Sequence, residues 1–375
     1  MSDKAPPPVT PPATPPATPP VPPQSAFQLW GRRLLTLAAA AAGGYAAFSL
    51  KIPLPWVLGA MMGTALVMLL GVGGRQPLQG RRAAQITIGT ALGLTFTQEV
   101  IREVASLGHW MLAGAAFSIM LTMLFSRVIQ RLAGIDGPTA IYSVAVGASA
   151  EMALQAQKAG ADGAQVASAH AIRIILVVTL ASVVAHYSGE KAGPYISAAT
   201  PAIGWQLALL FVFLAPACGW LADRMRVPNA WLLGPVIMAG SFAASGVNGR
   251  MFPEALVVAQ VLIGWSLGQH MTRQFFIKSP RMLASAAAVT LSMLAICVLL
   301  AWGLSKTGVI TLLTAFLAVA PGGTAEMAII AKTFGIGAPI VTAFHFFRVI
   351  STVLSIRWVF KFLVRTGWVH DKPAT

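Results

Sequence analysis

Charged side chains are scarce in this sequence of 375 residues: Asp, Glu, Lys and Arg make up 10% of it, whereas 56% is hydrophobic. Soluble domains carry about 25% charged residues, so an ordinary water-soluble fold is excluded. Acidic residues are fewer than basic ones, with 11 Asp and Glu against 26 Lys and Arg, and the net charge is +15. In so apolar a chain this excess indicates basic loops on the cytoplasmic side of a membrane rather than nucleic-acid binding.

Residues and motifs for common catalytic chemistry are also lacking. The two cysteines, Cys218 and Cys297, stand far apart within apolar runs, which excludes a disulfide framework and a cysteine zinc site. The six histidines have no paired spacing for a metal, and neither a phosphate-binding GxxxxGK[ST] loop nor a GxSxG nucleophile motif is present. We therefore expect no enzyme, no cofactor, no resident metal and no nucleic-acid partner.

Apolar segments of about 15 to 24 residues fill the chain after a proline-rich start, and most are near the length that crosses a bilayer. In the first half their cores cover residues 34–50, 53–71, 83–97, 107–129, 138–160 and 164–186. Residues 1–25 are expected to be a disordered or polyproline tail. Small-residue spacings such as Gly59-x-x-x-Gly63 and Gly89-x-x-x-Gly93 are interpreted as helix-packing contacts.

The second half of the sequence repeats the first half without gaps. One constant shift along the sequence aligns Trp30 with Trp205 and also aligns the other matching residues of the two halves. Polar pairs make the match specific, since apolar residues coincide often by chance. The matched pairs include Trp56 with Trp231, Gln85 with Gln260, Glu151 with Glu326, His170 with His345, and Arg173 with Arg348. The sequence therefore predicts an internal duplication.

Loop charges predict that the two halves have opposite orientations. The loop that contains Arg75, Arg81 and Arg82 is basic. Its counterpart in the second half contains Arg250 and Glu254, whose charges balance. The next loop is acidic in the first half and basic in the second, so the basic loops exchange places. Inverted halves need an odd number of crossings each. We thus expect an all-α polytopic fold with about 10 full crossings plus one broken or re-entrant segment per repeat, either 138–160 or the shorter 83–97.

Each half places an acid behind an interruption, and this is where we predict a site. Gly147 precedes Glu151, and Pro321-Gly322-Gly323 precedes Glu326. Ionisable residues in membrane segments are costly and commonly functional. The candidate substrate- or ion-binding residues are Glu151, Glu326, His170, His345, Arg173, Arg348, Gly147, Gly322, Gly323, Gln85 and Gln260.

Two interpretations of these residues stay open. In the functional one, Glu151 and Glu326 bind a cation or shuttle protons, the arginines bind substrate or the carboxylate of the alternate state, and the histidines titrate near neutral pH. In the structural one, each Glu forms a fixed ion pair with an Arg, and the His caps a helix or fills space.

The duplicated patterns Pro-x-x-Trp-x-Leu-Gly, Gln-x-x-Ile-Gly-x-x-Leu-Gly and Gly-x-x-Ala-Glu-Met followed by His-x-x-Arg resemble the AbrB membrane-protein family. The resemblance covers residues 30–360, and the second copy fits better because it has Pro321-Gly322-Gly323 where the first has Val146-Gly147-Ala148. Members carry this duplication, often under labels that name a transcriptional regulator or an ammonia monooxygenase. The second label would need a metal centre that the residues do not supply.

We expect a secondary transporter of a bacterial-type inner membrane, working by alternating access, with both termini cytoplasmic and coupling to an ion or proton left open. The alternatives are a membrane sensor that regulates gene expression without transport and, as a minor one, a membrane monooxygenase. Expected partners are a small-molecule or ion substrate and the bilayer, with homo-oligomerisation left open. The expected divisions are a tail (1–25), a first membrane repeat (26–190), a linker (191–203), a second membrane repeat (204–362) and a C-terminal tail (363–375).

Overall fold

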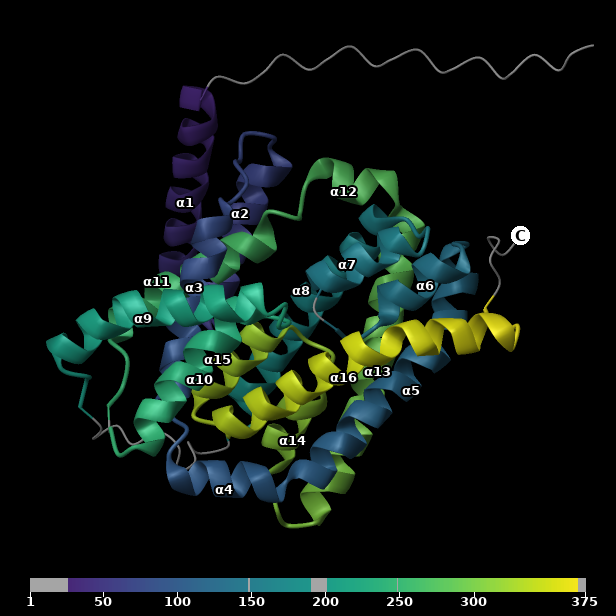
Figure 1. Cartoon of the computed structure of the whole chain (residues 1–375). Helices are drawn as coiled ribbons and strands as arrows, with labels where there is room; N and C mark the ends of the chain where they lie inside the picture. Colours follow the sequence, from purple (N-terminus) through teal and green to yellow (C-terminus); the bar gives the residue numbers. More distant parts are fainter. Residues whose placement is uncertain (1–25, 148, 190–200, 248, 370–375) are drawn as a thin grey trace, which may run out of the picture.

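The protein is helical throughout the part of the chain that the computed structural model describes, residues 26–147, 149–189, 201–247 and 249–369. Sixteen α-helices and no strand occur in these residues (Figure 1). Five helices are long and apolar enough to cross a bilayer: α5 (Gly108–Ala133), α8 (Gly163–Tyr187), α9 (Trp205–Arg224), α13 (Pro280–Lys306) and α16 (Ala338–Arg365). These helices confirm the prediction of an all-helical, multi-pass membrane protein. The predicted tail (1–25) and most of the predicted linker (191–203) lie outside the described residues.

Several further helices are apolar but shorter. They are α2 (Pro55–Leu69), α10 (Ala230–Ala244) and α11 (Pro253–Gly268), while α3 (Leu78–Gly93) matches α11 in length but is less apolar. At 1.5 Å per residue they are about 22 to 24 Å long, less than the roughly 30 Å of the hydrocarbon core. The segment at 83–97, which was the rival for the interrupted element, lies mostly in the uninterrupted helix α3.

The helices divide into two groups that each contain parts of both halves of the chain. In the first helix group, α1 (Ala26–Ser49) packs on α2 and α9 on α10, while α2 packs on α11 and α3 on α10. The second helix group contains α5 to α8 and α13 to α16, with α13 against α5 and α8, and α16 against α5. Contacts between the groups are sparse and involve mainly α3, α4 and α11 (Figure 1). Helices from both halves of the chain therefore pack together within each group, and few contacts join the two groups.

Glycines allow the close crossings in the first helix group. Gly89 and Gly93 of α3 lie against the backbone of α10, where a Cβ at Gly93 would be 2.6 Å from the Val236 carbonyl oxygen. Gly264 and Gly268 of α11 lie in the same way against α2, and Gly59 and Gly63 of α2 lie against α1. The interpretation of these spacings as packing contacts is confirmed, because no side chain fits between the helices.

Corresponding helices begin and end at matching positions in the two halves. Under the shift that aligns Trp30 with Trp205, α2 coincides with α10, α3 with α11, and the start of α8 with that of α16. Unusual backbone conformations recur under the same shift: Lys51 and Arg226 have φ of 54° and 59°, and Leu54 and Asn229 have φ of 48° and 53°. Positive φ is uncommon for residues other than glycine, so these pairs are specific structural matches.

Two short helices connect the helix groups, and the search for apolar segments missed both. They are α4 (Gln98–Ser106) and α12 (Arg273–Lys278), each begun by a threonine whose side chain accepts a hydrogen bond from a backbone N–H of the first turn. Figure 1 shows α4 and α12 at opposite ends of the molecule. α4 alternates acids and arginine with Val100, Ile101 and Val104, an amphipathic pattern that could have predicted it.

Candidate functional site

The chain leaves helical conformation in the middle of one membrane segment in each half. α6 (Gly137–Val144) is followed by α7 (Ser149–Lys158), and α14 (Leu312–Val319) by α15 (Thr324–Phe334). In the second break, Pro321 has no backbone N–H and cannot donate to the carbonyl of Leu317 four residues earlier. The predicted interruptions are therefore present, and each leaves carbonyl groups at the end of a half-helix that need other donors.

His170 and Arg173 of α8 supply those donors at the first break. His170 Nε2 lies 2.9 Å from the carbonyl oxygen of Tyr142, and Arg173 Nη1 donates to the carbonyls of Val144 and Ala145 at 3.2 and 3.1 Å. Both side chains are buried. The end of α6 is thus closed by a histidine and an arginine from one face of α8.

His345 and Arg348 of α16 repeat the arrangement at the second break. His345 Nε2 lies 2.8 Å from the carbonyl oxygen of Leu317, the group to which Pro321 has no N–H to donate. Arg348 donates to the carbonyls of Ala320 at 2.6 Å and Gly322 at 3.0 Å. The negative end of each half-helix dipole therefore faces a guanidinium group, which stabilises a buried cation without a carboxylate partner.

The hydrogen-bond partners assign one protonation form to both histidines. Each Nε2 faces a carbonyl and must carry a proton, while each Nδ1 lies 2.9 to 3.0 Å from the arginine Nη2 and must accept. Adding a proton at Nδ1 would break the bond to arginine and place two cations side by side. In this arrangement the histidines orient the arginines, and titration of the histidines near neutral pH stays a prediction.

The glutamates do not pair with the arginines in this structure. Among the described residues, no ion pair joins Glu151 or Glu326 to Arg173 or Arg348, so the fixed Glu–Arg pair of the structural interpretation is not formed. Glu326 is 8% exposed at the start of α15 and makes no hydrogen bond with a described residue. Glu151 is half-buried, and its Oε1 accepts from Gln155 Nε2 at 2.9 Å. The two acids therefore have different environments.

The remaining predicted residues separate into two places. Gly147 and Gly322 lie at the breaks, each against the methionine five residues later, and the Glu326 carboxylate folds over Gly323. Gln260 is buried in α11 and Gln85 is half-buried in α3, and neither hydrogen-bonds to a described residue. The structure thus brings the Gly, His and Arg residues of each half together at its break and leaves the glutamines in the first helix group.

Sequence reasoning missed several side chains that contact the breaks. Thr352 of α16 donates to the Val146 carbonyl at 3.3 Å, and the Cys297 thiol of α13 lies 3.5 Å from the Val319 carbonyl. Asn229, from the turn before α10, donates to the Thr324 hydroxyl at 3.2 Å. These residues stand within apolar runs or at a turn, and nothing in their local sequence marks them as contacts of the breaks.

A small cavity of about 10 Å³ adjoins Arg173 and is lined also by Ser143 and Thr290. The Arg173 Nε and the Ser143 hydroxyl are buried without a hydrogen-bond partner among the described residues, as is the Arg348 Nε. A cavity of this size holds about one water molecule. The Nε–H of each guanidinium group therefore takes no part in closing the half-helices.

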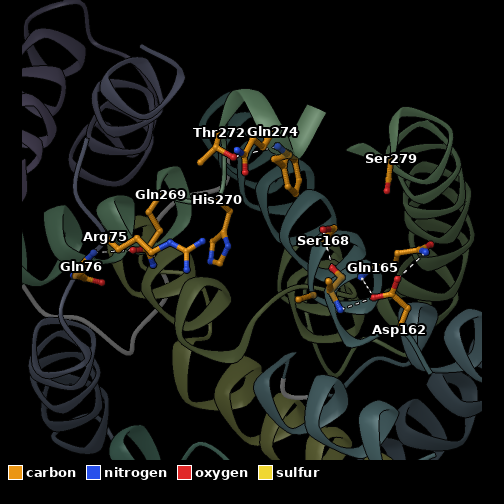
Figure 2. Close-up of a pocket in the computed structure, with 13 residues that line it drawn as sticks. Arg75, Gln76, Asp162, Gln165, Ser168, Gln269, His270, Thr272, Gln274 and Ser279 are labelled. Carbon is orange, nitrogen blue, oxygen red and sulfur yellow. Dashed lines mark hydrogen bonds between the residues drawn. The ribbon is translucent and has the colours of Figure 1, made fainter. Parts of the chain in front are cut away.

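A larger polar cavity of about 740 Å³ lies between the two helix groups (Figure 2). Its walls include Arg75 and Gln76 from the loop after α2, His270 after α11, and Gln165 and Ser168 from the start of α8. Desolvation within this recess, together with the positive charges of Arg81 and Arg75, lowers the pKa of His270 to about 4, so this imidazole is neutral at pH 7.

The fold and the breaks define a class: a polytopic helical membrane protein with two interrupted helices, each closed by a His–Arg pair. The model of the family described as "Transition state regulatory protein AbrB" matches residues 69–364, and the chain belongs to this family. The resemblance found in the sequence motifs is confirmed.

Two relatives match most of the chain. It is 25% identical over 312 residues to "Putative regulator AbrB" of Escherichia coli strain K12, covering 82% of this chain and 89% of the relative. It is 27% identical over 348 residues to "Uncharacterized protein YhjN" of Bacillus subtilis strain 168, covering 84% of this chain and 89% of the relative.

Proposed function

We propose that this protein is a secondary transporter of the bacterial inner membrane, in which two inverted-topology repeats give alternating access to a site between the interrupted helices. Inverted repeats and broken helices at the bilayer midplane are the pattern of many such transporters. The proposal includes no enzymatic reaction. Its substrate and coupling ion are small solutes that reach Glu326 and Glu151 from opposite sides.

One observation supports the duplication, and two support the inversion. Helix ends of the two halves coincide under one constant shift, and the corresponding helices α4 and α12 lie at opposite ends of the molecule (Figure 1). In addition, Arg75 after α2 and Thr272 after α11 line one cavity, so the basic loops of the two halves lie on the same side. By the positive-inside rule this side is cytoplasmic.

The observation that carries the transport proposal is the position of Glu326 directly behind the second break. The residue is 8% exposed and forms no ion pair or hydrogen bond with a described residue, and an ionisable residue in a membrane segment is costly in a purely structural role. At the start of α15 the helix dipole favours its negative charge. Such a group is suited to take up a cation or a proton during a transport cycle.

We expect Glu326→Gln to lower flux at least tenfold, because the amide keeps the shape and loses the charge. Flux is measured in proteoliposomes as uptake of a panel of labelled solutes and as proton movement. Glu151→Gln is the matched variant, with a smaller effect because Glu151 is half-buried and already bonded to Gln155. Wild-type flux in both variants, with folded protein verified by gel filtration, would remove the carboxylates from the mechanism.

Reporters fused at Gly80 and Ala255 are expected to lie on opposite sides of the membrane. These positions are equivalent in the two halves, near the starts of α3 and α11. Paired reporters that are active only in the cytoplasm or only in the periplasm give the measurement. If both positions report the cytoplasm, the inverted arrangement is wrong.

A second candidate function is a membrane sensor that influences gene expression without transport. The family description and the name of the Escherichia coli relative both refer to regulation, which favours it. The two candidates differ in proteoliposomes, where only a transporter moves solute. Ligand binding without flux for any solute in the panel would favour the sensor.

A further inference from the structure

We infer that the large polar cavity between the helix groups is the cytoplasmic binding vestibule for a small organic anion and that Arg75 recognises its carboxylate group. The inference rests on the proposed function, which it extends by naming the substrate class. It is carried by the position of the cavity, the charges on its walls and its hydrogen-bonding groups.

The cavity spans the boundary between the two helix groups. Figure 2 shows Arg75, Gln269 and His270 on one side and Asp162, Gln165 and Ser168 on the other, with Thr272 and Gln274 near α12. The first set belongs to loops of the first helix group and the second set to the start of α8. A solute bound here would touch both groups, so a change in their separation would change its contacts.

Arg75 gives the cavity a positive charge that can bind an anion. Its side chain is exposed and has no hydrogen bond or ion pair with a described residue. The positive charge of Arg81 also acts on this wall, since it contributes to the shift of His270. A guanidinium group binds a carboxylate through two parallel hydrogen bonds, whereas it repels a cation.

The acid in the lining does not cancel this charge. Asp162 Oδ1 accepts from the backbone N–H groups of Ala164 and Gln165 at 2.9 and 3.1 Å, and its Oδ2 accepts from Gln165 Nε2 at 2.9 Å. The carboxylate therefore caps α8, where the helix dipole also favours it. The cavity is left with a positive wall and, among its described lining residues, no acid free to bind a cation.

The neutral lining groups and the size suit a polar organic solute. Ser168, Thr272, Gln274 and Ser279 offer hydroxyl and amide groups around the space, and Phe275 is the aromatic side chain among them. Ligand sites for small molecules commonly have volumes of about 300 to 1,000 Å³.

The test measures binding of succinate, citrate and acetate to the full-length protein in nanodiscs, with uncharged succinamide as the control ligand. At least one of the three anions is expected to bind and succinamide not to bind. Arg75→Gln is expected to weaken anion binding at least tenfold. The matched control Arg102→Gln removes an exposed arginine from α4, at the opposite end of the molecule, and should bind as the wild type does.

Each other outcome overturns the inference: binding of none of the three anions, equal binding of succinamide, or unchanged binding by Arg75→Gln. Uptake assays separate this result from the proposed function. Arg75-dependent binding without uptake in proteoliposomes would refute transport and leave an anion-binding site. Uptake of an anion that does not depend on Arg75 would support transport and refute the recognition role of Arg75.

Discussion

Replacing Arg348 with Gln is expected to abolish flux and to lower the free energy of unfolding by about 3 kcal/mol or more. Arg348 donates to the carbonyls of Ala320 and Gly322 and to His345, and glutamine cannot make all three bonds. Leaving a buried acceptor without a donor costs about 1 to 3 kcal/mol, and this change exposes two carbonyls to an apolar environment. The second break would then lose its shape, which explains the loss of flux.

Cys297 provides a direct measurement of this change. The chain has two cysteines, so Cys218→Ser leaves Cys297 as the single thiol, 1% exposed and next to the Val319 carbonyl. A water-soluble maleimide should label it slowly in this background and faster after Arg348→Gln. The control is Arg365→Gln, an exposed arginine at the end of the same helix. Equal labelling and equal heat stability of both arginine variants would show that Arg348 does not hold the break.

Gly264→Leu is expected to prevent stable folding, with Gly264→Ala intermediate. A Cβ at Gly264 would lie 2.5 Å from the Val57 carbonyl oxygen and 2.7 Å from the Ala60 Cβ, so α11 and α2 would have to separate. Overpacking commonly costs about 1 to 3 kcal/mol, and here the opposing atoms include backbone that cannot rotate away. The heat-induced loss of monodisperse protein in detergent measures the effect.

Gly303→Ala is the matched control, because a Cβ at Gly303 in α13 meets nothing within 4 Å. Alanine favours helix over glycine by about 1 kcal/mol, so this variant should be as stable as the wild type or more stable. If Gly264→Ala also gained stability, the crossing of α2 and α11 would be looser than the structure shows.

Local features of the sequence predicted the positions of the breaks but not what closes them. Pro321 and the glycines beside it interrupt a helix through their own backbone chemistry, so their effect can be read without knowing the fold. The acceptors of Arg348 depend on how α16 packs beside α14, which spacing does not encode. Both open interpretations paired the arginines with carboxylates or substrate, because a charged partner is visible in a sequence and a free carbonyl is not.

The fold shows the same division. Apolar length and composition predicted membrane helices, and the Gly-x-x-x-Gly spacings predicted close contacts, but the partners of those contacts came only from the structure. Gly89, in the first half of the chain, packs on α10 of the second half. Gly264, in the second half, packs on α2 of the first half. α4 was missed because its nine residues are amphipathic rather than apolar, and a search for membrane-length segments passes over such a helix.

The exchange of helices between the halves has a consequence for either half by itself. Since α3 packs on α10 and α2 on α11, one half alone would expose both glycine-lined faces. A single repeat would therefore need a second copy of itself to bury them. Under the proposed inverted arrangement that second copy has the opposite orientation, and joining both copies in one chain keeps the glycine-lined faces covered.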